Sequence, residues 1–277
     1  MPPVLKEILI RAPIALVLAW GLVTGYMTLN QNSLIYFPAT DKPSPHVFGQ
    51  QDVEIISVKT SDGLNLQGWY KSSGQKNAPV MLVFHGNAGH IGYRTHFFNS
   101  YLHRGIDVLL AEYRGYGGNP GKPGEQGFYS DAQAYISYLI QEMKYDPKSV
   151  VLYGESLGTG IVVEMATRHA VGAIVLEAPY DTLVRLASTH HPYIPFLTYL
   201  MRDQYLSVYK IEDISVPKLF LMAGRDVVIP NKHTQALYDA AIPPKKLHIF
   251  PEAHHNNFYD YGADEVVYDY LKEINII

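Results

Sequence analysis

The chain has 277 residues, of which 47% are hydrophobic and 17% charged, so it can bury one sizeable core and does not belong to the disordered class. Its formal net charge of -4 leaves no excess of Lys and Arg to neutralise phosphates, which argues against a nucleic-acid partner. The absence of cysteine excludes a disulfide framework, a thiolate zinc site and a cysteine nucleophile.

An uncharged apolar segment lies near the N-terminus. Residues 12–40 contain no charged side chain, and residues 12–29 are just long enough to span a bilayer as a helix. We expect Pro13 to fall in the first turn of that helix, where a missing N–H costs little. Residues 1–30 are therefore predicted to be a retained membrane anchor.

Two alternatives compete with a retained anchor, namely a cleaved signal peptide and a buried or surface amphipathic helix. Cleavage is disfavoured because no clear small-x-small site occurs near residues 22–28. Lys6 and Arg11 precede the segment and only Lys42 follows it closely. This asymmetry favours an N-terminus in the cytoplasm and a domain on the other side of the membrane.

Residues 31–50 are rich in proline, asparagine and serine, and are predicted to be a linker on the surface of a single domain at residues 51–277. Two strand-like runs, "DVEIISVKT" and "LNLQGWYKS", flank Ser-Asp-Gly at residues 61–63, which predicts a hairpin.

Beyond the hairpin the chain alternates between two patterns. Short apolar runs typical of strands buried on both faces are "PVMLVFHG", "DVLLAEYRG", "SVVLYGES", "AIVLEAPY" and "KLFLMAGRD". Helix-like stretches occupy residues 94–103, 125–143 and 157–169. The alternation predicts an α/β fold with a mostly parallel sheet and helices on both faces. Ligands bind beyond the carboxyl ends of such strands, where each run gives way to polar residues.

The stretch "VVLYGESLGTG" places Ser156 in a G-x-S-x-G pattern between a strand-like and a helix-like run. A chain of this length shows the pattern by chance about one time in ten. A turn sharp enough to lift a serine hydroxyl above the sheet leaves no room for side chains two residues away, which explains the two glycines. The alternative is an ordinary helix cap with glycines for close packing.

A serine nucleophile needs a base and an acid that orients the base. On such a fold these follow the serine in the order Asp, His. Asp226 lies just beyond an apolar strand, although it is also suited to a turn that caps the stretch around Asn231. Two adjacent histidines, His254 and His255, follow the last strand-like run, "KLHIFP". The residue pattern alone leaves the choice between them open.

A hydrolase also needs N–H donors for the developing oxyanion. The N–H of Leu157 follows the serine, and Asn87 lies in a glycine loop, "FHGNAGH", residues 84–90. A phosphate-binding loop is disfavoured because no Lys-Ser/Thr ending follows. Zinc binding by His85, His90 and His96 is disfavoured because no carboxylate or cysteine joins them at ligand spacing, so no metal is expected.

Taken together, "FHGNAGHIGYR", "EYRGYGGNPGKPGEQGFYSDA", "YGESLGTG", "GRDVVIP" and "PEAHHNN" resemble the α/β-hydrolase superfamily. The similarity extends to its membrane-anchored branch, which includes protein depalmitoylases and bacterial hydrolases. The resemblance implies an α/β-hydrolase fold without a cofactor, with Ser156 as nucleophile, Asp226 as acid, His255 as base, and Asn87 and Leu157 as oxyanion donors. It selects His255 because the family usually has Gly-Thr-His-Asn here, which puts His254 at the threonine position.

The chain departs from the family pattern at three positions. Ala253 replaces a glycine that is usual in the family, and Glu112 and Asn257 each replace an aspartate. No member of the implied triad is lost.

The activity implied is cleavage of an ester or thioester, with a small-molecule or lipid-like acyl substrate. A serine peptidase is the alternative on the same fold, and a catalytically silent, membrane-tethered binding domain is the alternative of another class. Residues 181–215 have room for a small lid of one or two helices. Aromatic and apolar residues of this lid are predicted either to line an acyl pocket or to belong to the core: Tyr193, Pro195, Phe196, Tyr199 and Leu200.

Overall fold

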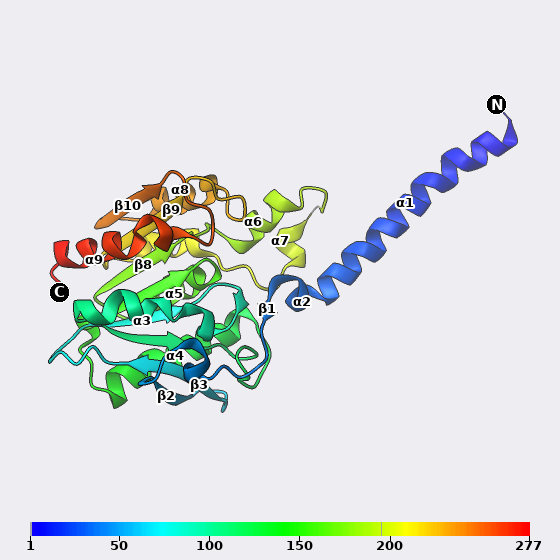
Figure 1. Cartoon of the computed structure of the whole chain (residues 1–277). Coiled ribbons are helices and arrows are strands. Elements are labelled where there is room, and N and C mark those ends of the chain that lie inside the picture. Colours follow the sequence, from blue (N-terminus) through cyan, green and yellow to red (C-terminus); the bar gives the residue numbers. More distant parts are fainter. Residues whose placement is uncertain (1, 195) are drawn as a thin grey trace.

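The body of the protein is built on one eight-stranded sheet (Figure 1). A computed structural model describes residues 2–194 and 196–277. The strands, in spatial order, are β10 (Lys245–Phe250), β9 (Lys218–Ala223), β8 (Ala173–Glu177), β7 (Val150–Glu155), β4 (Val80–Phe84), β6 (Asp107–Ala111), β3 (Asn65–Lys71) and β2 (Glu54–Lys59). All pairs from β10 to β6 are parallel, whereas β3 is antiparallel to both neighbours. The predicted mostly parallel sheet is confirmed.

The apolar runs become the central strands because they are covered on both faces. Every residue of β4, β6, β8 and β9 is buried, whereas β2 at the edge alternates between buried and exposed positions. The predicted hairpin joins β2 to β3, with Lys59 opposite Asn65. The Thr60 hydroxyl closes its turn by accepting the Leu64 N–H at 2.9 Å.

Helices cover both faces of the sheet and bury two apolar clusters. One face packs against α4 (Glu125–Ser137), α5 (Leu157–Arg168) and α8 (Asn231–Ala240). The opposite face packs against α3 (His96–Tyr101) and α9 (Ala263–Glu273). Neighbouring residues of β4 show the division, because Leu82 belongs to the first cluster and Val83 to the second. The lid contributes two further helices, α6 (Leu183–His190) and α7 (Leu197–Leu200).

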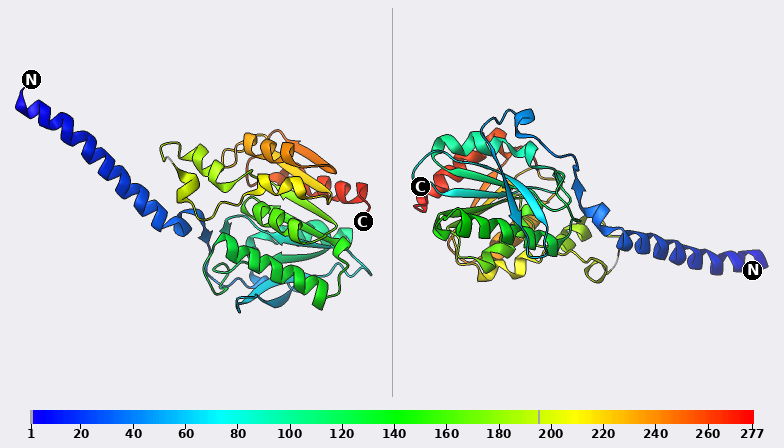
Figure 2. Two further views of the ribbon diagram at one scale, coloured as in Figure 1. Left: turned by 180° about the vertical axis from the view of Figure 1, so that it is seen from behind. Right: turned by 90° about the horizontal axis from the view of Figure 1, so that it is seen from below.

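The N-terminal helix α1 (Pro3–Leu29) projects away from the body (Figure 2). Its stretch Arg11–Leu29 has a mean hydropathy of 1.6 and is long and apolar enough to cross a membrane, as a signal sequence would also be. The expected position of Pro13 was wrong, because the helix begins ten residues earlier and the proline lies in its interior. The helix therefore loses one intrahelical hydrogen bond at that point.

The predicted linker at residues 31–50 is hydrogen-bonded to the body. It contains α2 (Gln31–Ile35) and the short strand β1 (Phe37–Pro38), which pairs in parallel with β5 (Ala88–Gly89) in the glycine loop. Tyr36 is buried, and its hydroxyl lies 3.0 Å from that of Tyr205. The segment that follows α1 is thus held against the face of the body that carries the glycine loop.

Candidate active site

Ser156 lies on the sharp turn between β7 and α5. Its backbone has a φ of +51°, a conformation that is rare for residues other than glycine. A Cβ added to Gly154 would lie 2.7 Å from the Gly158 carbonyl oxygen, and one added to Gly158 would lie 2.0 Å from the Phe84 carbonyl oxygen. Both glycines are therefore required sterically, as predicted for a turn that raises the serine above the sheet.

Asp226, His255 and Ser156 form a chain of hydrogen bonds although they come from three separate loops. The Nε2 of His255 lies 3.0 Å from the Ser156 hydroxyl oxygen, and its Nδ1 lies 2.8 Å from a carboxylate oxygen of Asp226. The histidine side chain is 11% exposed and the aspartate 2% exposed. This geometry allows the imidazole to take the serine proton while the carboxylate fixes its orientation.

The two adjacent histidines, His254 and His255, have different partners in the structure. The His254 ring faces the Arg225 carbonyl oxygen at 3.2 Å, and its backbone N–H donates to the Asn257 side chain at 2.7 Å. Asn257, one of the departures from the family pattern, thus stabilises the loop. His255 is left as the residue that faces the serine.

Asp226 has two roles in its loop. One carboxylate oxygen faces His255, and the other accepts the N–H groups of Val228 and Ile229, each at 2.8 Å. The sequence left open whether Asp226 forms a turn or contacts the histidine. In the structure Asp226 does both, and the turn holds its carboxylate against the imidazole.

The two predicted oxyanion donors lie beside the serine. Asn87 and Leu157 both line the same cavity as Ser156 and His255. Leu157 is the first residue of α5, where a backbone N–H has no acceptor within its own helix. Within the described ranges, neither backbone N–H donates to another protein group. Both donors are therefore available to a developing negative charge.

Buried contacts hold the glycine loop in place. Glu112 accepts from His85 Nε2 at 2.9 Å and from the Ile91 N–H at 2.9 Å. The Tyr116 hydroxyl donates to the Asn87 carbonyl oxygen at 2.8 Å, and the Asn87 side-chain amide donates to the Ile35 carbonyl oxygen. Glu112, one of the departures from the family pattern, thus holds the glycine loop through two hydrogen bonds. The contact with Ile35 ties the loop to the segment that follows the anchor.

The histidines considered as zinc ligands bind separate partners. His85 contacts Glu112, whereas His90 accepts the Gly92 N–H at 3.1 Å. His96 packs against Tyr259. Within the part of the chain that the structure describes, no group of three or more His, Asp or Glu side chains is arranged to hold a metal.

An ion pair that we did not predict joins the glycine loop to the serine turn. Arg94 donates to both carboxylate oxygens of Glu155, at 2.9 and 3.1 Å, and to the Ala88 carbonyl oxygen at 3.0 Å. Burial raises the pKa of Glu155, but the charge of Arg94 outweighs it and holds that pKa below its usual range. Burial and the neighbouring charge of Glu155 raise the pKa of Glu177 above its usual range.

A cavity of about 520 Å³ opens at the serine, and we call it the Ser156 cavity. The lid residues that line it include Leu197, Leu200 and Met201, spaced as one face of a helix. The predicted pocket residues Tyr193, Phe196 and Tyr199 are 65%, 69% and 87% exposed and are not among the described residues that line this cavity. Pro195 lies outside the described residues.

Comparison with known proteins agrees with this architecture. The family described as serine aminopeptidase, S33 matches residues 75–202. The protein MT2364 of Mycobacterium tuberculosis (strain CDC 1551 / Oshkosh) is 36% identical over 249 residues, which cover 89% of this chain and 87% of that protein. The lysophosphatidylserine lipase ABHD12 of Danio rerio is 31% identical over 198 residues, covering 65% of this chain and 51% of that protein.

The solved structures show the same fold. The esterase Pf2001 of Pyrococcus furiosus superposes with a TM-score of 0.69 at 16% identity, covering 86% of this chain and 98% of that chain. The chain therefore belongs to the α/β-hydrolase superfamily.

Proposed function

We propose that the protein is a serine hydrolase that cleaves carboxylic esters or thioesters through an acyl-enzyme on Ser156. The observation that carries the proposal is the hydrogen-bonded chain from Asp226 through His255 to Ser156. Those three side chains are distant in sequence and have no shared structural need to converge on one cavity.

The reaction begins when the Ser156 hydroxyl oxygen attacks the carbonyl carbon and His255 takes the hydroxyl proton. The N–H groups of Asn87 and Leu157 stabilise the oxyanion, a contribution of about 10²- to 10³-fold in rate per donor. The protonated histidine then gives its proton to the departing alcohol or thiol. A water molecule, deprotonated by the same histidine, attacks the acyl-enzyme and releases the acid.

Esters are favoured over aminopeptidase substrates by the charges around the cavity. An aminopeptidase has to hold a substrate ammonium group, and a free carboxylate is the natural partner for it. Glu155 is the one acidic residue among the described residues that line the Ser156 cavity, and Arg94 binds both of its carboxylate oxygens. The aminopeptidase named by the family match is therefore the second candidate, and aminoacyl amides should be turned over more slowly than acyl esters.

We further propose that α1 anchors the protein in a membrane with the hydrolase domain outside the cytoplasm. The support is the length and hydropathy of Arg11–Leu29 and the positive residues that precede it. A C-terminal reporter that works only outside the cytoplasm should be active, and activity of a cytoplasm-specific reporter would contradict this orientation.

The proposed chemistry is tested by turnover of p-nitrophenyl butyrate by the full chain in detergent. Ser156→Ala should lower kcat by at least about 10⁴-fold, because no other group can form the acyl-enzyme. Ser61→Ala is the matched control, because this exposed serine of the hairpin contacts only Ser130 and should keep full activity. Turnover by Ser156→Ala at the wild-type rate would overturn the proposal, as would the absence of turnover in the wild type, which the silent binding domain predicts.

A further inference from the structure

The Ser156 cavity extends from the serine to the membrane-anchor helix. Its lining includes Thr24, Met27 and Thr28 at the end of α1, and Leu34 and Ile35 of α2. The opposite wall comes from the lid. The catalytic domain therefore encloses only part of the cavity, and the anchor completes it.

We propose that the cavity admits the acyl chain of a membrane-resident ester along α1, so that the substrate is a single-chain amphiphile taken from the bilayer. The inference rests on the proposed function of Ser156 and adds the source and class of the substrate. The charged side chains among the described lining residues, Arg94 and Glu155, lie at the serine end beside His255, whereas the anchor end contributes only the uncharged polar residues Thr24, Thr28 and Gln31. The wall between that end and the anchor is largely aliphatic, which suits an alkyl chain and not a polar group.

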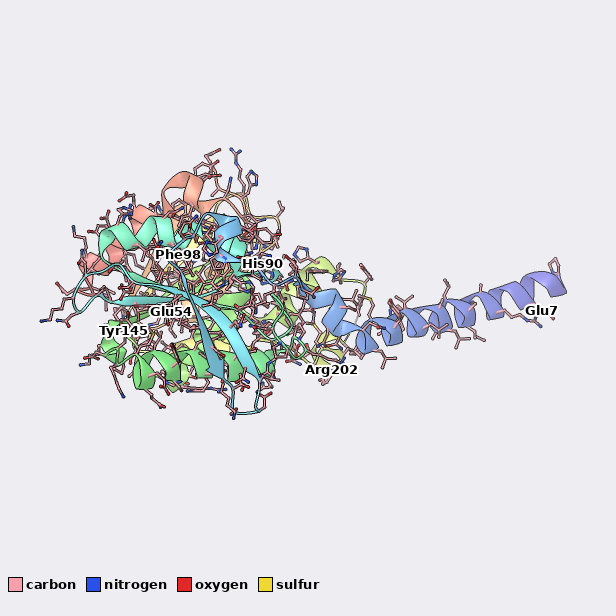
Figure 3. All side chains as sticks on the ribbon, turned by 60° about the horizontal axis from the view of Figure 1, so that its bottom comes forward. Glu7, Glu54, His90, Phe98, Tyr145 and Arg202 are labelled. Atoms are coloured by element: carbon pink, nitrogen blue, oxygen red, sulfur yellow. The ribbon has the colours of Figure 1, made fainter. Side chains whose placement is uncertain are left out.

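Direct hydrogen bonds hold the anchor end of this wall in place. The Gln31 side-chain amide donates to the Leu200 carbonyl oxygen at 2.5 Å, and its oxygen accepts the Arg202 N–H at 2.9 Å. The Arg202 guanidinium also donates to the Thr28 carbonyl oxygen at 3.3 Å. Gln31 is buried, so this paired contact is shielded from water. Figure 3 shows Arg202 beside the end of α1 that meets the body, with Glu7 at the far end.

Two aromatic side chains of the lid lie outside the Ser156 cavity and close to α1 in the chain's fold. Phe196 lines a shallow groove together with Trp20 of α1, and Tyr199 of α7 is 87% exposed. Figures 1 and 2 place the lid helices on the side of the body from which α1 departs. Exposed aromatic side chains beside a membrane span are typical of the membrane–water interface. The mouth of the cavity therefore lies where lipid chains are available.

The cavity volume is large enough for a substrate with one acyl chain. About 520 Å³ falls within the range of roughly 300–1,000 Å³ for pockets that hold one drug-sized ligand. A monoacyl ester or a thioester of a fatty acid fits this size.

The route is tested with two p-nitrophenyl esters and the full chain reconstituted in dioleoylphosphatidylcholine vesicles. In Met27→Trp the bulky ring narrows the cavity at α1, so the ratio of kcat/KM for the palmitate over the butyrate should fall about tenfold or more. Each methylene excluded from the apolar wall costs about fourfold. Leu34→Trp, on α2, should act in the same direction. Leu22→Trp is the matched control, because Leu22 is 76% exposed on α1 and is not among the described residues that line the Ser156 cavity or the shallow groove beside Trp20.

The outcomes separate this inference from the proposed function. Butyrate turnover by the wild type that is lost in Ser156→Ala supports the proposed function by itself. The route along α1 would be overturned if the ratio of kcat/KM for palmitate over butyrate were unchanged in both Met27→Trp and Leu34→Trp. It would also be overturned if that ratio fell equally in Leu22→Trp. Neither result would contradict the proposed function of Ser156. No turnover of either ester by the wild type would overturn both.

A direct probe does not depend on the variants folding. A hexadecyl fluorophosphonate that carries a diazirine at the end of its chain should label Ser156 and, after irradiation, crosslink to the peptide that contains residues 24–35. Labelling of Ser156 with crosslinks confined to the rest of the chain would contradict the route.

Discussion

At the scale of single residues, the candidate site depends on a strained backbone. Ser156 has a positive φ. The sharp turn is possible because Gly154 and Gly158 make close backbone contacts that a side chain at either position would block. The Ser156 N–H also donates to the Glu177 carbonyl oxygen at 2.8 Å, which fixes the turn to β8. The hydroxyl is thereby held where one imidazole can reach it.

The neighbouring histidines give the sharpest residue-scale prediction. His255→Gln should lower kcat for p-nitrophenyl butyrate by at least about 10⁴-fold, because the serine loses its base. His254→Gln should stay within about threefold of the wild type, since the described hydrogen bond of its ring is to the Arg225 carbonyl oxygen and not to Ser156 or Asp226. Steady-state kinetics on the two variants decides between them, and a larger loss in His254→Gln would reverse the assignment.

At the scale of elements, the loops around the serine are held by contacts between distant segments. Arg94 follows the glycine loop and Glu155 ends β7, so their ion pair links the loop with Asn87 to the turn with Ser156. Arg94 does not touch the reacting atoms and is a positioning residue. Its third contact, to the Ala88 carbonyl oxygen, fixes the loop next to the oxyanion donor.

Arg94→Met should therefore reduce kcat more than it raises KM, by about 10- to 100-fold in kcat, since a misplaced oxyanion donor acts in the transition state. Loss of the partner also leaves the Glu155 charge unpaired and should lower the free energy of unfolding by about 2 kcal/mol. Arg94→Lys should restore stability more than kcat, because an ammonium group keeps the charge but not the planar three-point contact. A KM effect alone, with kcat unchanged, would contradict the positioning role.

The same scale shows what the sequence could predict. The buried strands, the hairpin and the helices α3, α4 and α5 follow from local hydrophobic pattern and turn residues and were predicted, whereas α8 and α9 were not. Arg94 and Glu155 are far apart in the chain, and so are β1 and β5, so no local pattern reveals their contacts. The lid is intermediate, since its helices were expected but the face that each residue presents depends on packing against α1 and α2.

At the scale of the whole molecule, α1, α2 and the body of the protein line one cavity that opens at Ser156. The predicted linker at residues 31–50 pairs with the glycine loop through β1 and contributes α2 to the cavity wall. The sequence predicted an anchor at residues 1–30 and a surface linker at residues 31–50, because the apolar stretch gives way to one rich in proline, asparagine and serine. The composition of a segment predicts whether it favours lipid or water. It does not predict tertiary contacts such as the pairing of β1 with β5.

The central claim is that Ser156 is a nucleophile activated by His255. The most direct measurement is mass spectrometry of the full chain after reaction with a small fluorophosphonate, followed by peptide mapping. The account predicts one adduct, located on Ser156, in the wild type and in His254→Gln, with labelling lost in Ser156→Ala and slowed severely in His255→Gln. An unmodified wild type, or an adduct that persists in Ser156→Ala, would contradict it.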